Sequence, residues 1–265
     1  MRVINALIAG FAVLLGAFLT KHYINLDVWL SSFSVFLITI GGNLINDYFD
    51  AGIDKINNPQ RPIPSGKMTP DKALKISIIL FILGNVIFAF INLRLLYVGL
   101  FASLLLILYT PFLKPLPLIG NIGISLLLAL TLLVGAISAS GKLNVILFPA
   151  IFAFLLNFPR EILKDGEDII GDRKAGLHTF PIVFGIAKTR LLVLVLLIFL
   201  VISIVYASFS YSALFALCAG FGVVIPVIIM VKRSKNSPVW FRNTERILKI
   251  SIIPGMLALM LSGIR

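Results

Sequence analysis

Long apolar segments recur along the whole chain and limit what it can fold into. Hydrophobic residues make up 59% of the 265 positions and charged residues only 13%, a composition that soluble domains of this size do not have. A helix needs roughly 20 apolar residues to cross the hydrocarbon core of a bilayer. The sequence predicts nine such segments, at about 3–20, 27–45, 73–92, 95–112, 118–140, 145–163, 181–208, 211–232 and 246–263.

These segments are expected to be helices and not the strands of a barrel. Their apolar residues are continuous instead of alternating, and a helix satisfies its own backbone hydrogen bonds in lipid. The first segment is too long for the apolar region of a signal peptide and lacks a small-residue cleavage site. Residues 1–265 are therefore expected to form one all-α integral membrane domain, whose single cysteine, Cys218, forms no internal disulfide.

The distribution of basic residues indicates a membrane topology. The chain has 23 lysines and arginines against 11 acidic residues. With the N-terminus in the cytoplasm, nine spans place all the basic residues on the cytoplasmic side except Lys21, Arg94, Lys142 and Arg265. This asymmetry is the positive-inside pattern. We therefore expect a multi-pass protein of the cell membrane with no nucleic-acid partner, and nothing in the sequence implies a protein partner.

The acidic residues are concentrated in two clusters on the same predicted side. One lies in NDYFDAGIDKINNPQRPIPSG, residues 46–66, and the other in NFPREILKDGEDIIGD, residues 157–172. Each contains three aspartates with offsets of three and seven, which keeps their carboxylates within a roughly 60° arc of one helix face. The two triplets are Asp47, Asp50 and Asp54, and Asp165, Asp168 and Asp172.

This repeated spacing predicts a metal site. Like charges one helical turn apart destabilise an isolated helix by about 0.2–0.5 kcal/mol per pair, so the pattern requires a counter-charge. Carboxylates and an Asn carbonyl, without Cys or a well-placed His, suit Mg²⁺. Two Mg²⁺ ions are expected. A solvated acidic loop is the alternative, but it does not account for the duplicated spacing. The predicted metal ligands are Asn46, Asp47, Asp50, Asp54, Asp165, Asp168 and Asp172.

Groups suited to a phosphorylated substrate flank both clusters. Mg²⁺ commonly binds substrate phosphates, and the guanidinium of Arg61, stiffened by neighbouring prolines, suits two phosphate oxygens. A diphosphate at the inner face of an apolar bundle indicates a substrate with a hydrocarbon tail, such as an isoprenyl diphosphate. The predicted substrate-binding residues are Arg61, Ser65, Lys67, Tyr109, Lys114 and Arg160. The predicted catalytic residues are Asp50, Asp54, Lys164, Asp168 and Asp172.

Both motifs resemble those of the UbiA-type intramembrane prenyltransferases. The first is similar to their first aspartate-rich motif, and DGEDIIGDRKAG, residues 165–176, is similar to the second. The resemblance implies a ring of nine helices around a lipid-open chamber, capped by cytoplasmic loops at about 46–72 and 164–180. It also implies ionisation of a prenyl diphosphate to an allylic carbocation. One metal would be held by Asn46, Asp50 and Asp54, and the other by Asp168 and Asp172 with support from Asp165.

Residues 160–182, REILKDGEDIIGDRKAGLHTFPI, look most like the archaeal branch of that superfamily that makes digeranylgeranylglyceryl phosphate. This likeness implies geranylgeranyl diphosphate as the donor and the hydroxyl of the lipid-like geranylgeranylglyceryl phosphate as the acceptor. The product would carry the second ether bond of archaeal membrane lipid. One alternative is an aromatic acceptor, such as a quinone or chlorophyll-type precursor. Another is a divalent-cation transporter, although that class usually places its carboxylates near the bilayer midplane.

Overall fold

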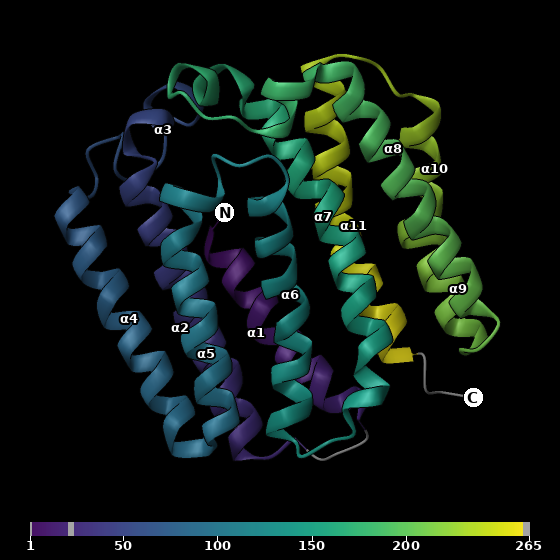
Figure 1. Cartoon of the computed structure of the whole chain (residues 1–265). Coiled ribbons are helices and arrows are strands. Elements are labelled where there is room, and N and C mark those ends of the chain that lie inside the picture. Colours follow the sequence, from purple (N-terminus) through teal and green to yellow (C-terminus); the bar gives the residue numbers. More distant parts are fainter. Residues whose placement is uncertain (1, 21–23, 262–265) are drawn as a thin grey trace.

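The structure, a computed structural model, describes residues 2–20 and 24–261 and is a bundle of long helices (Figure 1). No strand occurs among these residues, so the all-α prediction is confirmed. The long helices are α1 (Arg2–Leu19), α2 (Leu26–Phe49), α4 (Pro70–Ile91), α5 (Leu93–Leu108), α6 (Ile119–Ser138), α7 (Leu143–Lys174), α8 (Phe180–Ser208) and α11 (Pro238–Leu261). The shorter elements are α3 (Ala51–Asn57), α9 (Ala213–Ala219), α10 (Ile225–Lys232) and the π-helical η1 (Tyr109–Leu113) and η2 (Gly220–Val224).

Seven helical segments in the described part of the chain are long and apolar enough to cross a membrane. They are α2, α4, α5 with η1, α6, α7, α8, and α9 through α10. The apolar helix Val3–Leu19 is shorter, and α11 carries four charged side chains in its first half, at Arg242, Glu245, Arg246 and Lys249. Lys21 and Arg265, which entered the topology prediction, lie outside the described residues.

Two helices continue past the apolar residues that predicted them. Helix α2 ends at Phe49 instead of near residue 45, and α7 continues to Lys174 instead of ending near residue 163. Much of the two predicted cap loops is therefore helical. Hydropathy locates the lipid-compatible part of a helix, whereas packing decides where the helix ends. The side chain of Phe241 packs directly over Gly166 in this extension of α7.

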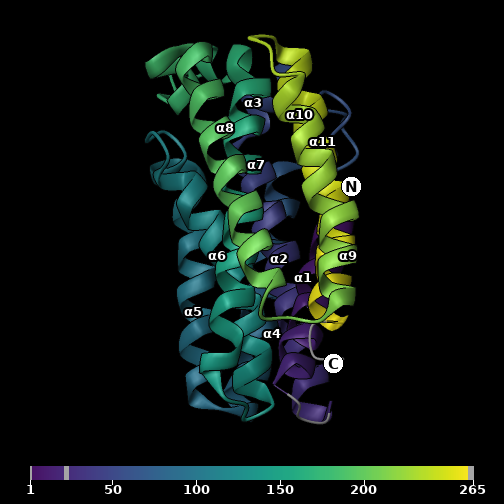
Figure 2. The ribbon, with the colours of Figure 1, turned by 90° about the vertical axis from the view of Figure 1, so that its right-hand side faces the viewer.

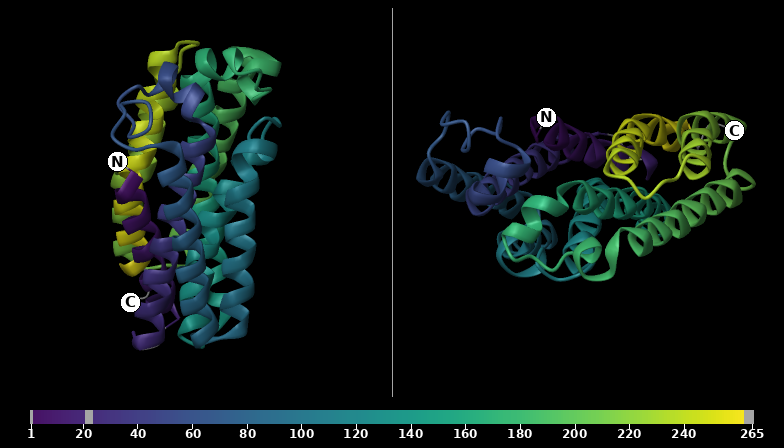
Figure 3. Two further views of the ribbon diagram at one scale, coloured as in Figure 1. Left: turned by 90° about the vertical axis from the view of Figure 1, so that its left-hand side faces the viewer. Right: turned by 90° about the horizontal axis from the view of Figure 1, so that it is seen from above.

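Seen from above, the helices lie in two rows (Figure 3). Helices α4, α2, α1 and α11 with α9–α10 form one row, and α5, α6, α7 and α8 form the other. The side view in Figure 2 shows the same two rows next to each other. Helices consecutive in the chain pack together, and α11 returns to pack against α1. Helix α1 also packs against α6 across the middle of the bundle.

Two glycines allow α1 and α6 to approach closely. A Cβ atom at Gly16 would collide with the carbonyl oxygen of Leu132, and a Cβ atom at Gly135 would collide with that of Val13. Lipid tails are as apolar as the helix side chains, so helices in a membrane gain nothing from hydrophobic burial against each other. Close packing of this kind therefore stabilises helix pairs there. The contact between α1 and α6 therefore depends on the absence of a side chain at both positions.

We expect Gly135→Ala to lower the thermal stability of the purified protein, because the added methyl group must push α1 away from α6. Overpacking of this kind typically costs about 1–3 kcal/mol. The control is Gly220→Ala, because a Cβ atom there meets no heavy atom within 4 Å. Thermal unfolding in detergent measures both variants, and an equal midpoint for the two would contradict the prediction.

Candidate active site

The two acidic clusters lie at the same end of the bundle, where α3 packs against α7 (Figure 1). Asp50 caps both the end of α2 and the start of α3. The backbone stays hydrogen-bonded through this junction, since the N–H of Asp50 donates to Asn46 O and that of Asp54 donates to Asp50 O, both at 2.8 Å. The row of Asn46, Asp50 and Asp54 predicted from their spacing thus follows an almost continuous helical path.

Basic side chains balance the first cluster. Arg61 Nη1 donates to both carboxylate oxygens of Asp54 at 2.6 Å and lies 3.7 Å from Asp47 Oδ1. Lys114 Nζ donates to the two carboxylate oxygens of Asp50 at 2.8 and 2.9 Å. All three aspartates are buried. These ion pairs offset the cost of removing the carboxylates from water.

Lys114 remains a cation at neutral pH. Burial alone would lower the pKa of Lys114, but the carboxylates of Asp50 and Asp172 outweigh it, so the pKa of Lys114 is raised above its ordinary value. The stabilisation from this pairing is fully present below the ordinary lysine pKa. It is lost only as the pH rises through the raised pKa.

The π turn η1 brings Tyr109 and Lys114 to the same site although they are five residues apart. The N–H of Lys114 donates to Tyr109 O at 2.7 Å, which closes the wider turn. Thr110 Oγ1 in this turn donates to Asn46 Oδ1 at 2.8 Å. Tyr109 itself lies within electrostatic range of Asp50 and Asp165. The π turn thus directs the Thr110 hydroxyl to Asn46 and the Lys114 ammonium to Asp50.

The second cluster lies on the last turns of α7. Asn121 Nδ2 of α6 donates to Asp165 Oδ2 at 2.8 Å. Asp172 is only 1% exposed, and neither of its carboxylate oxygens has a hydrogen-bond partner among the described residues. A buried carboxylate without a partner is unfavourable and suits a cation ligand. Lys114 is within electrostatic range of both Asp50 and Asp172, so the two clusters face a common site.

Asn57, at the end of α3, joins the two clusters directly. Its Nδ2 donates to Asp168 O at 3.2 Å, and its Oδ1 accepts the N–H of Gly171 at 3.1 Å. A Cβ atom at Gly171 would collide with the Asn57 amide. Asn57, Thr110 and Asn121 were not among the residues predicted from the sequence. The one available signal for Asn57 was Gly171, because a glycine inside a helical pattern often marks a close approach.

Some predicted site residues lie elsewhere. Ser65 and Lys67 are exposed in the turn before α4, and Ser65 Oγ donates only to Pro62 O, at 3.4 Å. Arg160 is directed towards α11, where its Nε donates to Glu245 Oε1 at 2.9 Å. Lys164 remains beside the second cluster, within electrostatic range of Asp168, although its Nζ donates to Glu161 Oε2 at 3.0 Å.

The described residues contain no group of three or more His, Cys, Asp or Glu side chains arranged to hold a metal ion. Three carboxylates of the two clusters have protein partners instead. Asp50 is engaged by Lys114, Asp54 by Arg61 and Asp165 by Asn121.

These features define a helical membrane protein with two facing aspartate clusters at one end of the bundle. The chain belongs to the UbiA prenyltransferase family, whose model matches residues 6–252, so the resemblance noted in the two motifs is confirmed. The seven apolar segments and this membership make it a multi-pass membrane protein.

Full-length relatives carry a more specific name. The chain is 34% identical to a digeranylgeranylglyceryl phosphate synthase of Methanospirillum hungatei JF-1, covering 100% of this chain and 96% of the relative. It is 37% identical to the protein of that name from Thermococcus sibiricus, covering 100% and 95%.

Solved structures share the fold. One concerns digeranylgeranylglyceryl phosphate synthase in membranes and matches with a TM-score of 0.76 at 29% identity, over 98% of this chain and 95% of the other. Another is a UbiA homologue from Archaeoglobus fulgidus bound to DMAPP and Mg²⁺. It matches with a TM-score of 0.71 at 17% identity, over 97% of each chain.

We expect Asn57→Ala to release α3 from α7, because the two hydrogen bonds of the amide are lost. Each such bond is worth about 0.5–1.5 kcal/mol, so amide hydrogen exchange in residues 51–57 should become roughly 5- to 150-fold faster. Asn58→Ala is the control, since it removes an amide from the same stretch without touching this contact. Exchange rates that are equal in the two variants would show that Asn57 does not hold α3 in place.

Proposed function

We propose that the protein transfers a geranylgeranyl group from geranylgeranyl diphosphate to the free hydroxyl of geranylgeranylglyceryl phosphate. The observation that carries this proposal is the meeting of two aspartate clusters with Lys114 and Arg61 at one end of the bundle. The full-length relatives named digeranylgeranylglyceryl phosphate synthase support this choice of acceptor. The DMAPP and Mg²⁺ bound to the Archaeoglobus fulgidus homologue support a prenyl diphosphate donor.

The aspartate clusters fit Mg²⁺ by their chemistry. They offer oxygen ligands, and Asp172 is a buried carboxylate without a hydrogen-bond partner. Bound Mg²⁺ would withdraw charge from the diphosphate and make it a better leaving group. Two ions are proposed. Asn46, Asp50 and Asp54, with Asp47 beside them, would hold one, and Asp168 and Asp172, supported by Asp165, would hold the other.

The reaction exchanges one carbon–oxygen bond for another and removes one proton from the acceptor. The bond between the allylic carbon and the diphosphate oxygen breaks, and its electron pair leaves with the oxygen. The acceptor hydroxyl then donates an electron pair to the allylic cation and forms the ether bond, and its proton passes to the released diphosphate, which is a base. Arg61 and Lys114 stabilise the charge that develops on the departing diphosphate. Tyr109 and Lys164 assist as groups that bind the diphosphate or stabilise the cation.

The membrane part of the protein protects this reaction from water, which would otherwise capture the allylic cation. We infer that α1 and α11 cross the cell membrane beside the seven apolar segments, so that nine spans surround a lipid-open chamber. The packing of α1 against α2, α6 and α11 supports this inference. The positive-inside pattern supports a cytoplasmic N-terminus and a cytoplasmic site. Residues 1–265 then form one domain, capped by about 46–72 and 164–180.

Incubation of the purified protein with Mg²⁺, geranylgeranyl diphosphate and a panel of acceptors tests the proposal. We expect mass spectrometry to detect prenylated geranylgeranylglyceryl phosphate, and chelation of the metal by EDTA to abolish the product. Excess Mg²⁺ added back should restore it. Prenylation of an aromatic acceptor alone would replace the proposed function with the aromatic alternative, and undiminished transfer in EDTA would exclude the metal-dependent mechanism.

Asp50→Ala and Asp168→Ala should each reduce prenyl transfer by about 10²–10³-fold or more, the typical cost of removing one group that stabilises transition-state charge. The two variants remove one carboxylate from each cluster. Asp27→Ala is the matched control, because Asp27 lies in the first turn of α2, at the far end of that helix from Asp50. Thermal unfolding checks that all three variants fold, and retained transfer in both site variants would remove the two-cluster mechanism.

A further inference from the structure

A second polar cluster lies beside the aspartate site, between α7 and α11. Arg160 is 8% exposed, and its guanidinium donates to Glu245 Oε1 at 2.9 Å and to Asn157 Oδ1 at 2.8 Å. Lys249 lies one turn beyond Glu245 on α11, within electrostatic range of Arg160 and Lys164. Three cations, Arg160, Lys164 and Lys249, meet here with two carboxylates, Glu161 and Glu245, and Asp165 of the aspartate site also lies within electrostatic range of Lys164.

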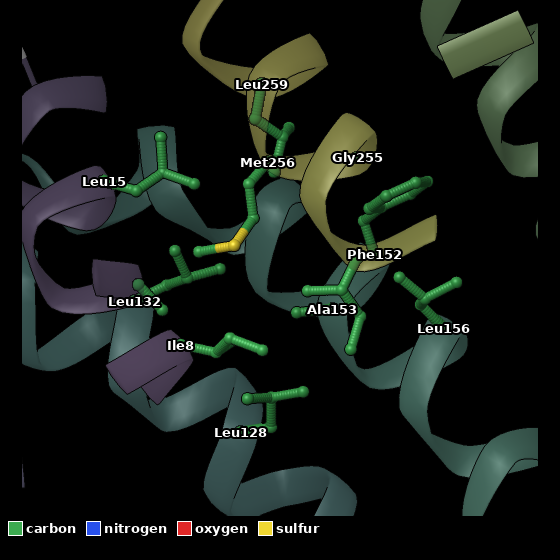
Figure 4. A pocket seen from close by; sticks show the side chains of 12 residues that line it. Ile8, Leu15, Leu128, Leu132, Phe152, Ala153, Leu156, Gly255, Met256 and Leu259 are labelled. Atoms are coloured by element: carbon green, nitrogen blue, oxygen red, sulfur yellow. The ribbon is translucent and has the colours of Figure 1, made fainter. Parts of the chain in front are cut away.

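This cluster lies at the end of an apolar cavity formed by α1, α6, α7 and α11 (Figure 4). On α7, the cavity residue Leu156 comes one turn before Arg160. On α11, Lys249 comes one turn before the cavity residue Ile252. Since α7 ends and α11 begins at the same end of the bundle, both basic residues lie between the cavity and that end (Figure 1).

The cavity is small in this conformation. Its volume of about 40 Å³ is close to the ~30 Å³ that one water molecule occupies in the liquid. Ligand pockets usually measure roughly 300–1,000 Å³. Met256 projects from α11 between Leu15 and Leu132 (Figure 4), and methionine has flexible torsions that adapt readily to a new neighbour. Rotation of Met256 would therefore begin to open a path for a hydrocarbon chain.

Helix α7 presents the basic cluster and the aspartates on neighbouring faces. At about 100° per residue, Arg160 and Lys164 are about 40° apart around the helix, and Asp168 follows about 40° further on. Hydrogen bonds also link the two sites through α6. Asn157 Nδ2 donates to Ser125 Oγ at 3.4 Å, and Ser125 Oγ donates to Asn121 O at 2.7 Å. Asn121 in turn contacts Asp165.

We propose that Arg160 and Lys249, with Lys164 at the border of the two sites, bind the phosphate monoester of the acceptor while its hydrocarbon chain enters the apolar cavity. The inference rests on the proposed function and adds to it the place where the acceptor head group binds. The guanidinium of Arg160 suits two phosphate oxygens, and the ammonium of Lys249 adds a point charge.

The chemistry of the acceptor agrees with this placement. Its reactive hydroxyl is on the glycerol carbon next to the one that carries the phosphate. A phosphate held on the Arg160 face of α7 therefore brings the hydroxyl towards the aspartate face, where the donor ionises. A purely structural link between α7 and α11 would need only Arg160 and Glu245. Lys249 adds a cation that this link does not use, which suits an incoming dianion.

The test compares Lys249→Met, which removes the charge and keeps an apolar stem, with Lys249→Arg, which keeps the charge. Lys235→Met, in the exposed segment between α10 and α11, is the matched control. Equilibrium binding of geranylgeranylglyceryl phosphate to the purified protein is measured without donor and without Mg²⁺. We expect Lys249→Met to weaken binding about tenfold or more, the usual effect of losing one contact to a charged group.

Lys249→Arg and Lys235→Met should bind the acceptor within about twofold of the unchanged protein, and geranylgeranyl diphosphate should bind all the variants equally. The second ligand is geranylgeranylglycerol, which lacks the phosphate. It should bind weakly to the unchanged protein and be insensitive to Lys249→Met.

Unchanged acceptor binding by Lys249→Met, or equal binding of the two acceptors by the unchanged protein, overturns the phosphate site. If the protein still prenylates geranylgeranylglyceryl phosphate, the proposed function survives that result. If it binds no geranylgeranylglyceryl phosphate and prenylates only an aromatic acceptor, both the phosphate site and the proposed function are wrong.

Discussion

The pairing of buried carboxylates with Lys114 and Arg61 is the interaction on which the site depends. Asp50 and Asp54 are withdrawn from water at the end of an apolar bundle, where an uncompensated charge is strongly unfavourable. Each is met by a cation from a different part of the chain: Lys114 after η1, and Arg61 from the segment after α3. The charge balance therefore ties together three separate segments of the chain.

The same balance of charges explains how the site can exist both without a substrate and with a metal-bound diphosphate. Lys114 and Arg61 neutralise the aspartates in the structure described here. A metal-bound diphosphate would bring both positive and negative groups, so the cations would turn from the carboxylates to the phosphate oxygens without a large change in net charge. Asp172 is buried without a hydrogen-bond partner, which is unfavourable for a carboxylate. A metal-bound diphosphate beside Asp172 would remove this unfavourable free energy.

Much of the site follows from the sequence because its spacing is local. The steps of four in the first motif placed Asn46, Asp50 and Asp54 on one helical path, and hydropathy located the helices. The contacts of Asn57 and Asn121 did not follow, since they join residues 111, 114 and 44 positions apart in the chain. The direction of the Arg160 side chain did not follow from the sequence either, because it depends on Glu245 of α11. The hydropathy pattern placed the start of that helix too late in the chain. Hydropathy counts apolar side chains, and it does not detect where a helix continues because another helix packs against it.

The unbroken length of α7 has a consequence for how the enzyme would behave in different membranes. Because Arg160 and the aspartates all follow Pro159, the second internal proline of this 32-residue helix, their separation is set by the helical repeat and not by a hinge or loop. Changes in bilayer thickness or lateral pressure would tilt or shift this helix as a unit. The distance between the bound donor and the bound acceptor would then not depend on the fluidity of the membrane, whose lipids are made from the product.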